Sequence, residues 1–487
     1  MRMIYLDLDS LRPDHLSGYG YHRPTSPNLD RIIRDGMRFT HAYCQTSPCV
    51  PSRAALFSGR YDVHSGVVTH WGPGSHLRGS EANSGRGNLS APPMFIRHLF
   101  ANGYRPISFS SFADRHNAWW FCTGWSEFHT TGLKRGNERA DEVNSYVLPW
   151  LREHAHEDNF FLHLQYWDPH RVYRMPLEWL DRVKDYPPPD WPDAAAIEQH
   201  QASYGPFTAS ELYPGGDGPP PHAPSMPRQI ASVADWKQLI DGYDASIAFM
   251  DDQIGQVLAT LEQAGVLDET AFIISADHAE GQGEFAVYGD HCNASESVHN
   301  IPLVIRWPGV TRPNSVCDDF VYNVDLPPTL CDLLDIESPD GWDGRSFAPQ
   351  LRSAQGSPRD YLVWSHGLYA CQRVVRTPRW ALMRTYNPGL FPYEPLALFD
   401  MANDPHQTRD VQAEHPEVVR ELDHLMNGWL QEQLGYQGAA VDPLQLVVET
   451  GPFKYVQLDN WLDRLERRGR TGDADAIRQR LRLTPKG

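Results

Sequence analysis

Four short apolar segments, each followed at once by polar or charged residues, do most to limit what this chain can fold into. They occupy residues 3–10, 160–168, 270–278 and 301–307. Each has the length of a β-strand. Between them lie helical patterns, above all residues 235–265, where apolar residues recur every three or four positions up to a terminal glycine. Strands that alternate with helices predict an α/β fold whose sheet is covered by helices on both faces.

Acidic residues and one histidine stand at the ends of two of these segments. Asp7 and Asp9 lie two positions apart, so their side chains project from the same face of the first strand. Asp277 and His278 end the third segment in a similar way. Ligands of such folds gather at the carboxyl ends of strands, and hard oxygen donors with one imidazole suit Ca²⁺, Mg²⁺ or Mn²⁺. Taken alone, either pair could equally be a helix cap or a surface pair.

The pattern changes after about residue 360, which predicts two domains. Residues 1–360 form the larger α/β domain, and residues 361–487, with short strands, a helix over 414–434 and a charged tail, form a smaller C-terminal α+β domain. Within the first, residues 186–227 are too rich in proline and glycine for regular structure. This insertion is interpreted as a cover over a site, a subunit contact in a homo-oligomer, or a solvated loop.

Charge and cysteine content exclude several classes of function. The chain has 43 Lys and Arg against 62 Asp and Glu, and no basic block predicts binding to nucleic acid. An anionic substrate must therefore be met by local positive charge. The seven cysteines are scattered without a CxxC pair, which argues against a disulfide framework. No run of 18 apolar residues and no signal-peptide pattern is found, so we expect a cytoplasmic protein without a membrane partner.

Several motifs occur in an order that resembles one known family. They are "DLDSLRPDHLSGYGYHRPTSPNLDRI", "CVPSR", "YWDPH", "SADHAEGQGEF" and "IPLVIRWPG". This series, over about residues 3–310, resembles the sulfatases of the alkaline phosphatase superfamily. The most specific motif is Cys-x-Pro-Ser-Arg, which is intact from Cys49 to Arg53. The resemblance implies an alkaline phosphatase-like fold, a central mixed sheet between helices with the smaller domain attached.

The resemblance also implies the reaction. In this family the motif cysteine, here Cys49, is oxidised by a maturation enzyme to Cα-formylglycine, whose hydrate is a geminal diol. One diol oxygen attacks sulfur, and the other later loses its proton and expels sulfate by re-forming the aldehyde. We therefore expect hydrolysis of a small sulfate ester, either a saccharide or an aromatic sulfate. The alternatives are a phosphonate monoester or phosphodiester hydrolase of the same superfamily and a catalytically silent binding protein of this fold.

The family's metal site carries over to particular residues. The resemblance places one divalent cation, Ca²⁺ with Mn²⁺ or Mg²⁺ as alternatives, on Asp9, the residue derived from Cys49, Asp277 and His278. Many sulfatases have a second aspartate where this chain has Ser10. Asp7 either supplies the missing oxygen or lies below the metal as a buried hydrogen-bonding partner, and both interpretations stay open.

Further residues are expected to act on the substrate. Arg53 would hold the nucleophile and the carboxylates by forked hydrogen bonds, and His170 matches the family histidine that contacts the leaving oxygen, which makes it the candidate general acid. Typical members carry lysines after the "GY" turn and before the "IPL" strand, and this chain lacks both. His291 stands in place of the second lysine. We expect His291, His116 and His70 to line the substrate pocket.

Overall fold

A computed structural model describes residues 1–78, 93–216, 218–220, 223, 225–353, 359–435, 441–452 and 455–481. Its centre is an eight-stranded mixed sheet in the order β12-β2-β11-β8-β1-β7-β5-β6. The strands, in that order, are Ser315–Cys317, Met37–Phe39, Leu303–Arg306, Thr270–Ser275, Arg2–Leu8, Phe160–Tyr166, Arg105–Phe109 and Glu127–His129. All four apolar segments of the sequence form strands of this sheet, and β1 lies between β7 and β8, parallel to both.

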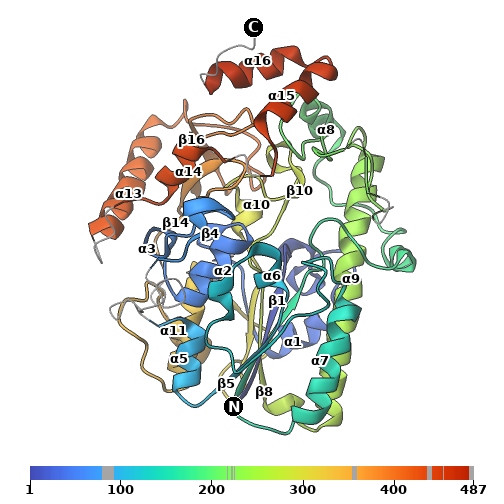
Figure 1. The fold of residues 1–487 in the computed structure, drawn as a ribbon, viewed down its shortest axis with the longest axis vertical. Helices are drawn as coiled ribbons and strands as arrows, with labels where there is room; N and C mark the ends of the chain where they lie inside the picture. The colour runs from blue at the N-terminus through green and yellow to red at the C-terminus, as the bar shows by residue number, and fades with distance from the viewer. Residues whose placement is uncertain are drawn as a thin grey trace.

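Helices cover both faces of the sheet, as Figure 1 shows. On one side the long helix α9 (Val233–Gln263) packs against α7 (Ala140–His154), and α1 (Leu29–Asp35) adjoins α9. On the other side lie α2 (Cys49–Ser58), α5 (Phe95–Ala101) and α11 (Leu326–Leu333). The predicted helix over 235–265 corresponds to α9. No helix among the described residues is long and apolar enough to cross a membrane.

A second, five-stranded sheet lies above the first in Figure 1 and has the order β17-β16-β15-β14-β4. Its strands are Leu396–Asp400, Trp380–Asn387, Cys371–Arg376, Leu362–His366 and Thr46–Ser47. Helix α13 (Pro416–Gly435) packs on it. The edge strand β4 comes from the N-terminal part of the chain and pairs in parallel with β14, His366 opposite Ser47. The C-terminal region thus holds the segment that leads directly into α2. The predicted boundary at residue 360 stays a prediction.

The insertion over 186–227 was expected to lack regular structure, and this expectation is wrong for one part of it. Residues Ala194–His200 form helix α8, because Asp193 caps its first turn, its carboxylate accepting from the Ala196 N–H at 2.8 Å, and three alanines favour the helix. The charged tail is also helical, as α15 (Leu458–Arg467) and α16 (Thr471–Arg480). It packs on the insertion: Arg464 donates to Glu211 at 2.8 Å.

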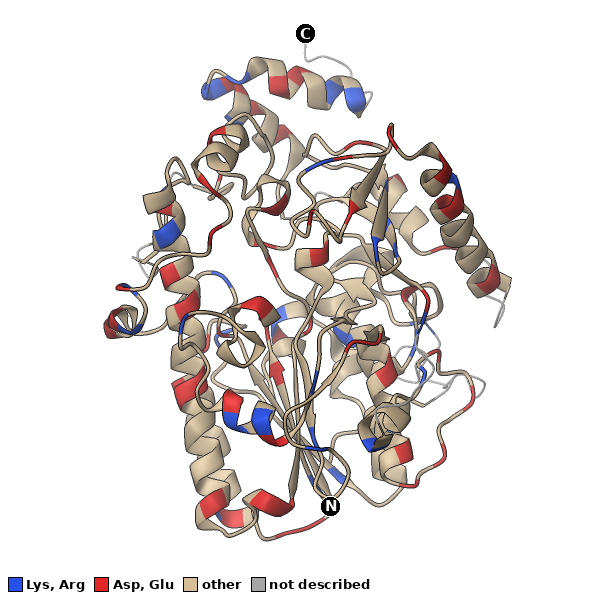
Figure 2. Ribbon diagram, turned by 180° about the vertical axis from the view of Figure 1, so that it is seen from behind, with Lys and Arg blue, Asp and Glu red and all other residues tan. Residues whose placement is uncertain are grey.

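Charge is distributed over the whole fold. Acidic and basic positions are interspersed along most elements (Figure 2). The apolar side chains of the central sheet and its covering helices form one continuous core, and the C-terminal sheet has a smaller core of its own with α13. The seven cysteines are all free.

His64 links the N-terminal half of the chain to the C-terminal helix α13 and provides a pH-dependent contribution to stability. Its Nδ1 lies 2.7 Å from Asp343 Oδ2 and its Nε2 lies 2.8 Å from the Gln433 carbonyl oxygen. Both ring nitrogens thus face acceptors. Burial opposes the charged form, but the hydrogen bond and charge of Asp343 outweigh it and raise the pKa of His64.

A histidine with a raised pKa binds more protons in the folded state, so its stabilisation is present below the unfolded pKa of about 6.5 and is lost as pH rises through the folded pKa. His64→Gln should therefore lower the free energy of unfolding by about 1–3 kcal/mol at pH 5.5 and by less at pH 9. Thermal or urea unfolding at both pH values tests this. His98→Gln is the control, because burial lowers the pKa of His98. An equal loss at both pH values would contradict the protonated pair.

Candidate active site

The candidate site lies at the carboxyl ends of the two central strands β1 and β8. Asp7 stands opposite Ser275 in their parallel register. Asp9 and Asp277 each follow two residues later, so the geometry of the sheet brings their carboxylates together. The side chains of Asp9, Asp277 and His278 are all buried. The two acidic strand ends of the sequence therefore belong to one site.

Helix α2 brings Cys49 and Arg53 to these carboxylates. Cys49 is the first residue of the helix, and Arg53, four residues on, lies on the same face. The Arg53 guanidinium donates from Nε and Nη2 to the two Asp7 oxygens at 2.8 and 2.9 Å, and from Nη1 to Asp277 Oδ2 at 2.6 Å. Its Nη2 also lies 3.1 Å from Asp9 Oδ2. Arg53 is thus a buried clamp that fixes three carboxylates relative to the helix that carries Cys49.

Four of the predicted ligands converge. Asp9, Cys49, Asp277 and His278 each offer one ligand atom, and these atoms all lie within 4.8 Å of one another. Asp9 Oδ2 is buried and accepts no hydrogen bond, although Arg53 Nη2 lies 3.1 Å away. Burial, followed by the charge of Asp277, raises the pKa of Asp9 to about 7, and burial also raises the pKa of Asp277. Burial thus disfavours the ionised form of both carboxylates, and one oxygen of Asp9 accepts no hydrogen bond. These properties fit a site that holds a divalent cation.

The neighbours of this cluster orient its members. His278 Nδ1–H donates to the Ala279 carbonyl oxygen at 2.8 Å, which leaves Nε2 facing Cys49 Sγ at 3.2 Å. Ser10 has a left-handed backbone with φ 60°, donating its N–H to Asp277 Oδ1 at 3.2 Å and its hydroxyl to Asp9 Oδ1 at 3.1 Å. Ser10 therefore supports the carboxylates where many relatives have an aspartate.

Asp7 lies outside the cluster of four. Besides the Arg53 clamp, its Oδ2 lies 3.1 Å from His163 Nε2. Although burial opposes ionisation, Arg53 and His163 together lower the pKa of Asp7 to about 2. This geometry favours the second of the two interpretations, a buried partner that positions Arg53.

The histidines expected in the substrate pocket form one group beside the cluster. The ring centroid of His291 lies 4.4 Å from that of His278 and 6.5 Å from that of His70, and His70 lies 4.7 Å from His116. Both ring nitrogens of His116 and the Nε2 of His70 are buried without a hydrogen-bond partner. Burial lowers the pKa of His70, His116 and His291 well below the usual value. These three imidazoles are therefore neutral and lie side by side, and His70 and His116 have ring nitrogens that are free to bind a ligand.

His170 stands on the other side of Trp167, with ring centroids 5.6 Å apart. Its Nδ1–H donates to the Arg171 carbonyl oxygen, so Nε2 is the ring nitrogen that can carry an exchangeable proton. Arg115 Nη2 lies 3.4 Å from this nitrogen. Burial, then the charges of Arg115 and Arg174, lower the pKa of His170.

Three further residues at the site were missed by the sequence reasoning. Arg115 and Arg174 lie beside His170. The hydroxyl of Tyr455, from the segment before α15, is hydrogen-bonded to His70 Nδ1 at 2.8 Å. Arg115 directly precedes His116 in the sequence, so its position next to a predicted pocket residue was a signal that could have found it. Arg174 stands four residues after His170, and Tyr455 has no motif that connects it to the site.

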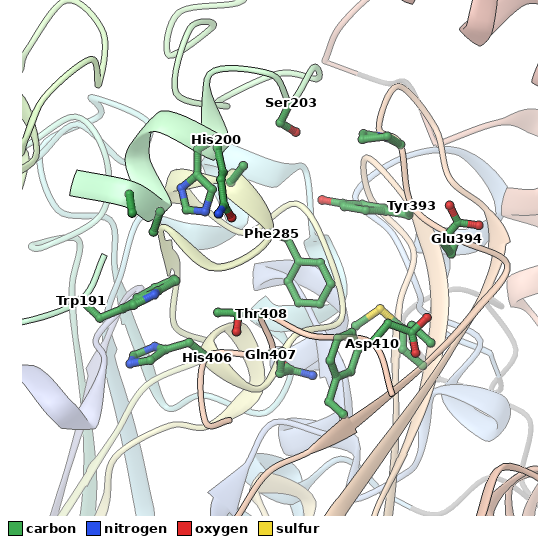
Figure 3. A pocket seen from close by; sticks show the side chains of 18 of the residues that line it. Trp191, His200, Ser203, Phe285, Tyr393, Glu394, His406, Gln407, Thr408 and Asp410 are labelled. Atoms are coloured by element: carbon green, nitrogen blue, oxygen red, sulfur yellow. The ribbon is translucent and has the colours of Figure 1, made fainter. Parts of the chain in front are cut away.

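One large cavity is separate from the carboxylate cluster. It has a volume of about 580 Å³ and lies between α8 of the insertion, residues 285–286, and the C-terminal sheet. In Figure 3, Trp191 and His406 lie against each other, with their rings stacked and the ring centroids 4.0 Å apart. Phe285 and Tyr393 line the opposite wall. No Lys or Arg is among its lining residues. The cavity therefore lacks the positive charge that a sulfate would need.

Comparisons with known proteins agree with this geometry. The Sulfatase family model matches residues 2–336, and a second model, N-sulphoglucosamine sulphohydrolase, C-terminal, matches residues 283–432. An ulvan-active sulfatase of Formosa agariphila is 23% identical over 465 residues, covering 88% of this chain and 81% of the relative.

Two solved structures are similar in fold. BT4656, in complex with its substrate D-glucosamine-2-N,6-O-disulfate, has a TM-score of 0.72 at 18% identity, covering 90% of this chain and 99% of the other. The phosphonate monoester hydrolase of Agrobacterium radiobacter has a TM-score of 0.69 at 22% identity, covering 89% and 96%. The predicted fold class, an alkaline phosphatase-like α/β fold with a central mixed sheet, is confirmed.

Proposed function

The chain belongs to the sulfatase family of sulfuric-ester hydrolases, and we propose that it acts through a formylglycine derived from Cys49 beside one divalent cation. The observation that carries this proposal is the position of Cys49 Sγ within the same 4.8 Å cluster as the ligand atoms of Asp9, Asp277 and His278. A catalytically silent protein of this fold would be expected to have lost part of this set. Here the cysteine, the arginine clamp and four ligand atoms are present, and Ser10 is the one departure from the family pattern of nucleophile and ligands.

Asp9, Asp277, His278 and the oxidised residue 49 would hold the cation. Once oxygen replaces the sulfur of Cys49, the donor set is rich in oxygen, which suits Ca²⁺, with Mn²⁺ or Mg²⁺ as alternatives. When bound, such a cation supplies positive charge that stabilises negative charge developing on the reacting groups. The Arg53 clamp keeps the carboxylates in place and adds a second fixed positive charge.

The remaining steps fall to the residues of the chain. One hydroxyl of the formylglycine hydrate gives up its proton and attacks sulfur, the bond between sulfur and the ester oxygen breaks, and the leaving alcohol takes up a proton. Loss of a proton from the second hydroxyl then re-forms the aldehyde and releases sulfate, and addition of one water molecule restores the hydrate. His170 Nε2 is the proposed donor to the leaving oxygen. The free nitrogens of His70 and His116, together with the ring of His291 beside His278, are proposed to contact the sulfate.

The proposed substrate is a small sulfated saccharide, with an aromatic sulfate as the alternative. It is supported by the structural neighbour whose bound substrate is a disulfated glucosamine. The proposed partner in maturation is a formylglycine-generating enzyme, and we propose a cytoplasmic location. A phosphonate monoester hydrolase is the second candidate, because a neighbour of similar fold has that name.

Two measurements test the proposal. Mass spectrometry of the peptide that contains Cys49, from protein made in the native host, should find the side chain CH₂SH replaced by CHO or its hydrate. Turnover of 4-nitrophenyl sulfate should exceed turnover of a 4-nitrophenyl phosphonate ester. An unmodified thiol would refute the nucleophile, and the reverse order of turnover would favour the phosphonate hydrolase.

The role of His170 predicts a dependence on the leaving group. His170→Gln should lower kcat/KM for phenyl sulfate by about 10²–10⁴-fold, since phenolate leaves slowly without a proton. The loss should shrink along the series to 4-chlorophenyl and 4-nitrophenyl sulfate, whose leaving groups are less basic. Equal losses for all three esters would assign His170 to binding rather than to proton donation.

A further inference from the structure

Arg115 and Arg174 carry positive charge that no carboxylate of the described residues neutralises by an ion pair. The lysine and the other arginine that line one cavity with Arg174 do have such partners: Lys134 pairs with Glu142, and Arg139 with Asp141 at 2.7 Å. Arg115 and Arg174 form no ion pair with a described residue, although both are only partly exposed. Partly buried cations without counter-charges need an anion from elsewhere.

Carbonyl and amide oxygens hold the two guanidinium groups in place. Arg115 Nη1 donates to the carbonyl oxygens of Arg135 and Gly136 at 3.0 and 3.4 Å, and its Cζ lies 4.9 Å from the Trp167 ring. Arg174 Nη2 donates to Asn137 Oδ1 at 2.8 Å. The same loop, residues 135–137, thus anchors both. The Nε of Arg174 is buried and has no hydrogen-bond partner.

The surroundings of Arg174 provide space for a ligand. A cavity of about 500 Å³ is lined by Lys134, Asn137, Arg139, Glu142 and Arg174. Burial lowers the pKa of Arg174 to about 10, the charge of Asp168 partly opposes this effect, and repulsion from Arg115 adds to it. Among the cations that line this cavity, Arg174 is the one that forms no ion pair with a described carboxylate, although the charges of Asp168, Glu138 and Asp9 act on it from farther away. A bound anion would relieve both the burial cost and the repulsion.

The cavity adjoins the proposed catalytic centre. Arg115 Nη2 lies 3.4 Å from His170 Nε2, and the charges of both arginines act on His170. The charge of Asp9 also acts on Arg174. A ligand at Arg174 and a sulfate at the cluster could therefore belong to the same molecule.

We propose that Arg174, with Arg115, binds a second anionic group of the substrate, a sulfate or a carboxylate, so that the preferred substrate carries two negative groups. This inference rests on the proposed function and narrows its substrate class to doubly anionic molecules. Arg174 is then a specificity-determining residue. It selects the substrate through a group that does not react, whereas Arg53 and the cluster act on the sulfate that is removed.

The test counts bound sulfate ions, with inorganic ³⁵S-sulfate as the probe in equilibrium dialysis. The wild-type protein should bind two sulfate ions. Arg174→Gln should weaken the binding of one of these ions by about 10–100-fold, because the ion loses a charged hydrogen-bonding partner. Arg139→Gln is the matched control, because Arg139 lines the same cavity but is paired with Asp141, and it should retain both ions. A single sulfate site that Arg174→Gln leaves unchanged would overturn the proposal.

Two further measurements identify the second anionic group of the substrate and distinguish a failure of this inference from a failure of the proposed function. Displacement of the Arg174-dependent sulfate by glucuronate rather than by glucosamine N-sulfate would identify a carboxylate, and the reverse would identify a sulfate. Displacement by neither would overturn the proposal for sugar substrates. The wild-type protein should hydrolyse the singly charged 4-nitrophenyl sulfate. If the wild-type protein does not hydrolyse this ester, the proposed function fails, while the sulfate count still reports on Arg174.

Discussion

Cys49→Ala should remove turnover of sulfate esters, by about 10⁶-fold if the covalent route is the main one, while the protein stays folded. Alanine has no sulfur to oxidise, so neither formylglycine nor its hydrate can form. The fold should tolerate the change because alanine favours helices at the first position of α2, and removal of one buried sulfur costs only about 1 kcal/mol. Activity assays and circular dichroism of the same preparation measure both effects.

The matched control for this prediction is Cys44→Ala. Cys44 is also fully buried and lies five residues before Cys49, but its thiol is not part of the cluster of four ligand atoms. It should keep full activity. Wild-type turnover in Cys49→Ala would end the covalent mechanism, and a comparable loss in Cys44→Ala would indicate that removal of a buried thiol damages the fold rather than the chemistry.

The centre of the site could be predicted because its residues follow local patterns. Strand-like segments put Asp9 and Asp277 at strand ends, and the parallel register of β1 and β8 then aligns the two. Cys49 and Arg53 lie one helical turn apart within a single motif. Each of these relations depends on residues close in sequence or on the regular geometry of a sheet.

Other parts of the site depend on contacts between distant segments. Tyr455 reaches His70 across 385 positions, and β4 becomes part of a sheet only through its pairing with β14. Nothing in the local sequence of either segment encodes these contacts, because packing of the C-terminal region on the N-terminal half creates them. Helix α8 was missed for a different reason: prolines and glycines dominate the composition of the insertion, while a capping aspartate and three alanines decide the structure of one short part of it.

Asp277→Asn should abolish the stabilisation of the protein by Ca²⁺. Asp277 contributes one of the four convergent ligand atoms, and its loss should weaken binding of the cation by more than the roughly 10–100-fold typical for a partner beyond the ligands. Ligands that bind only the folded state raise its stability in proportion to the logarithm of their concentration. The wild-type melting temperature should therefore rise with added Ca²⁺ and fall with a chelator, whereas that of Asp277→Asn should respond to neither.

Asp7→Asn provides the contrast, because Asp7 bonds Arg53 and His163 and stands outside the cluster. It should keep most of the response to Ca²⁺ yet lose activity, since the Arg53 clamp loses an anionic partner. If Asp7→Asn loses the response to Ca²⁺ as completely as Asp277→Asn does, Asp7 is also a ligand of the bound cation. If both variants keep the response, the cation binds elsewhere.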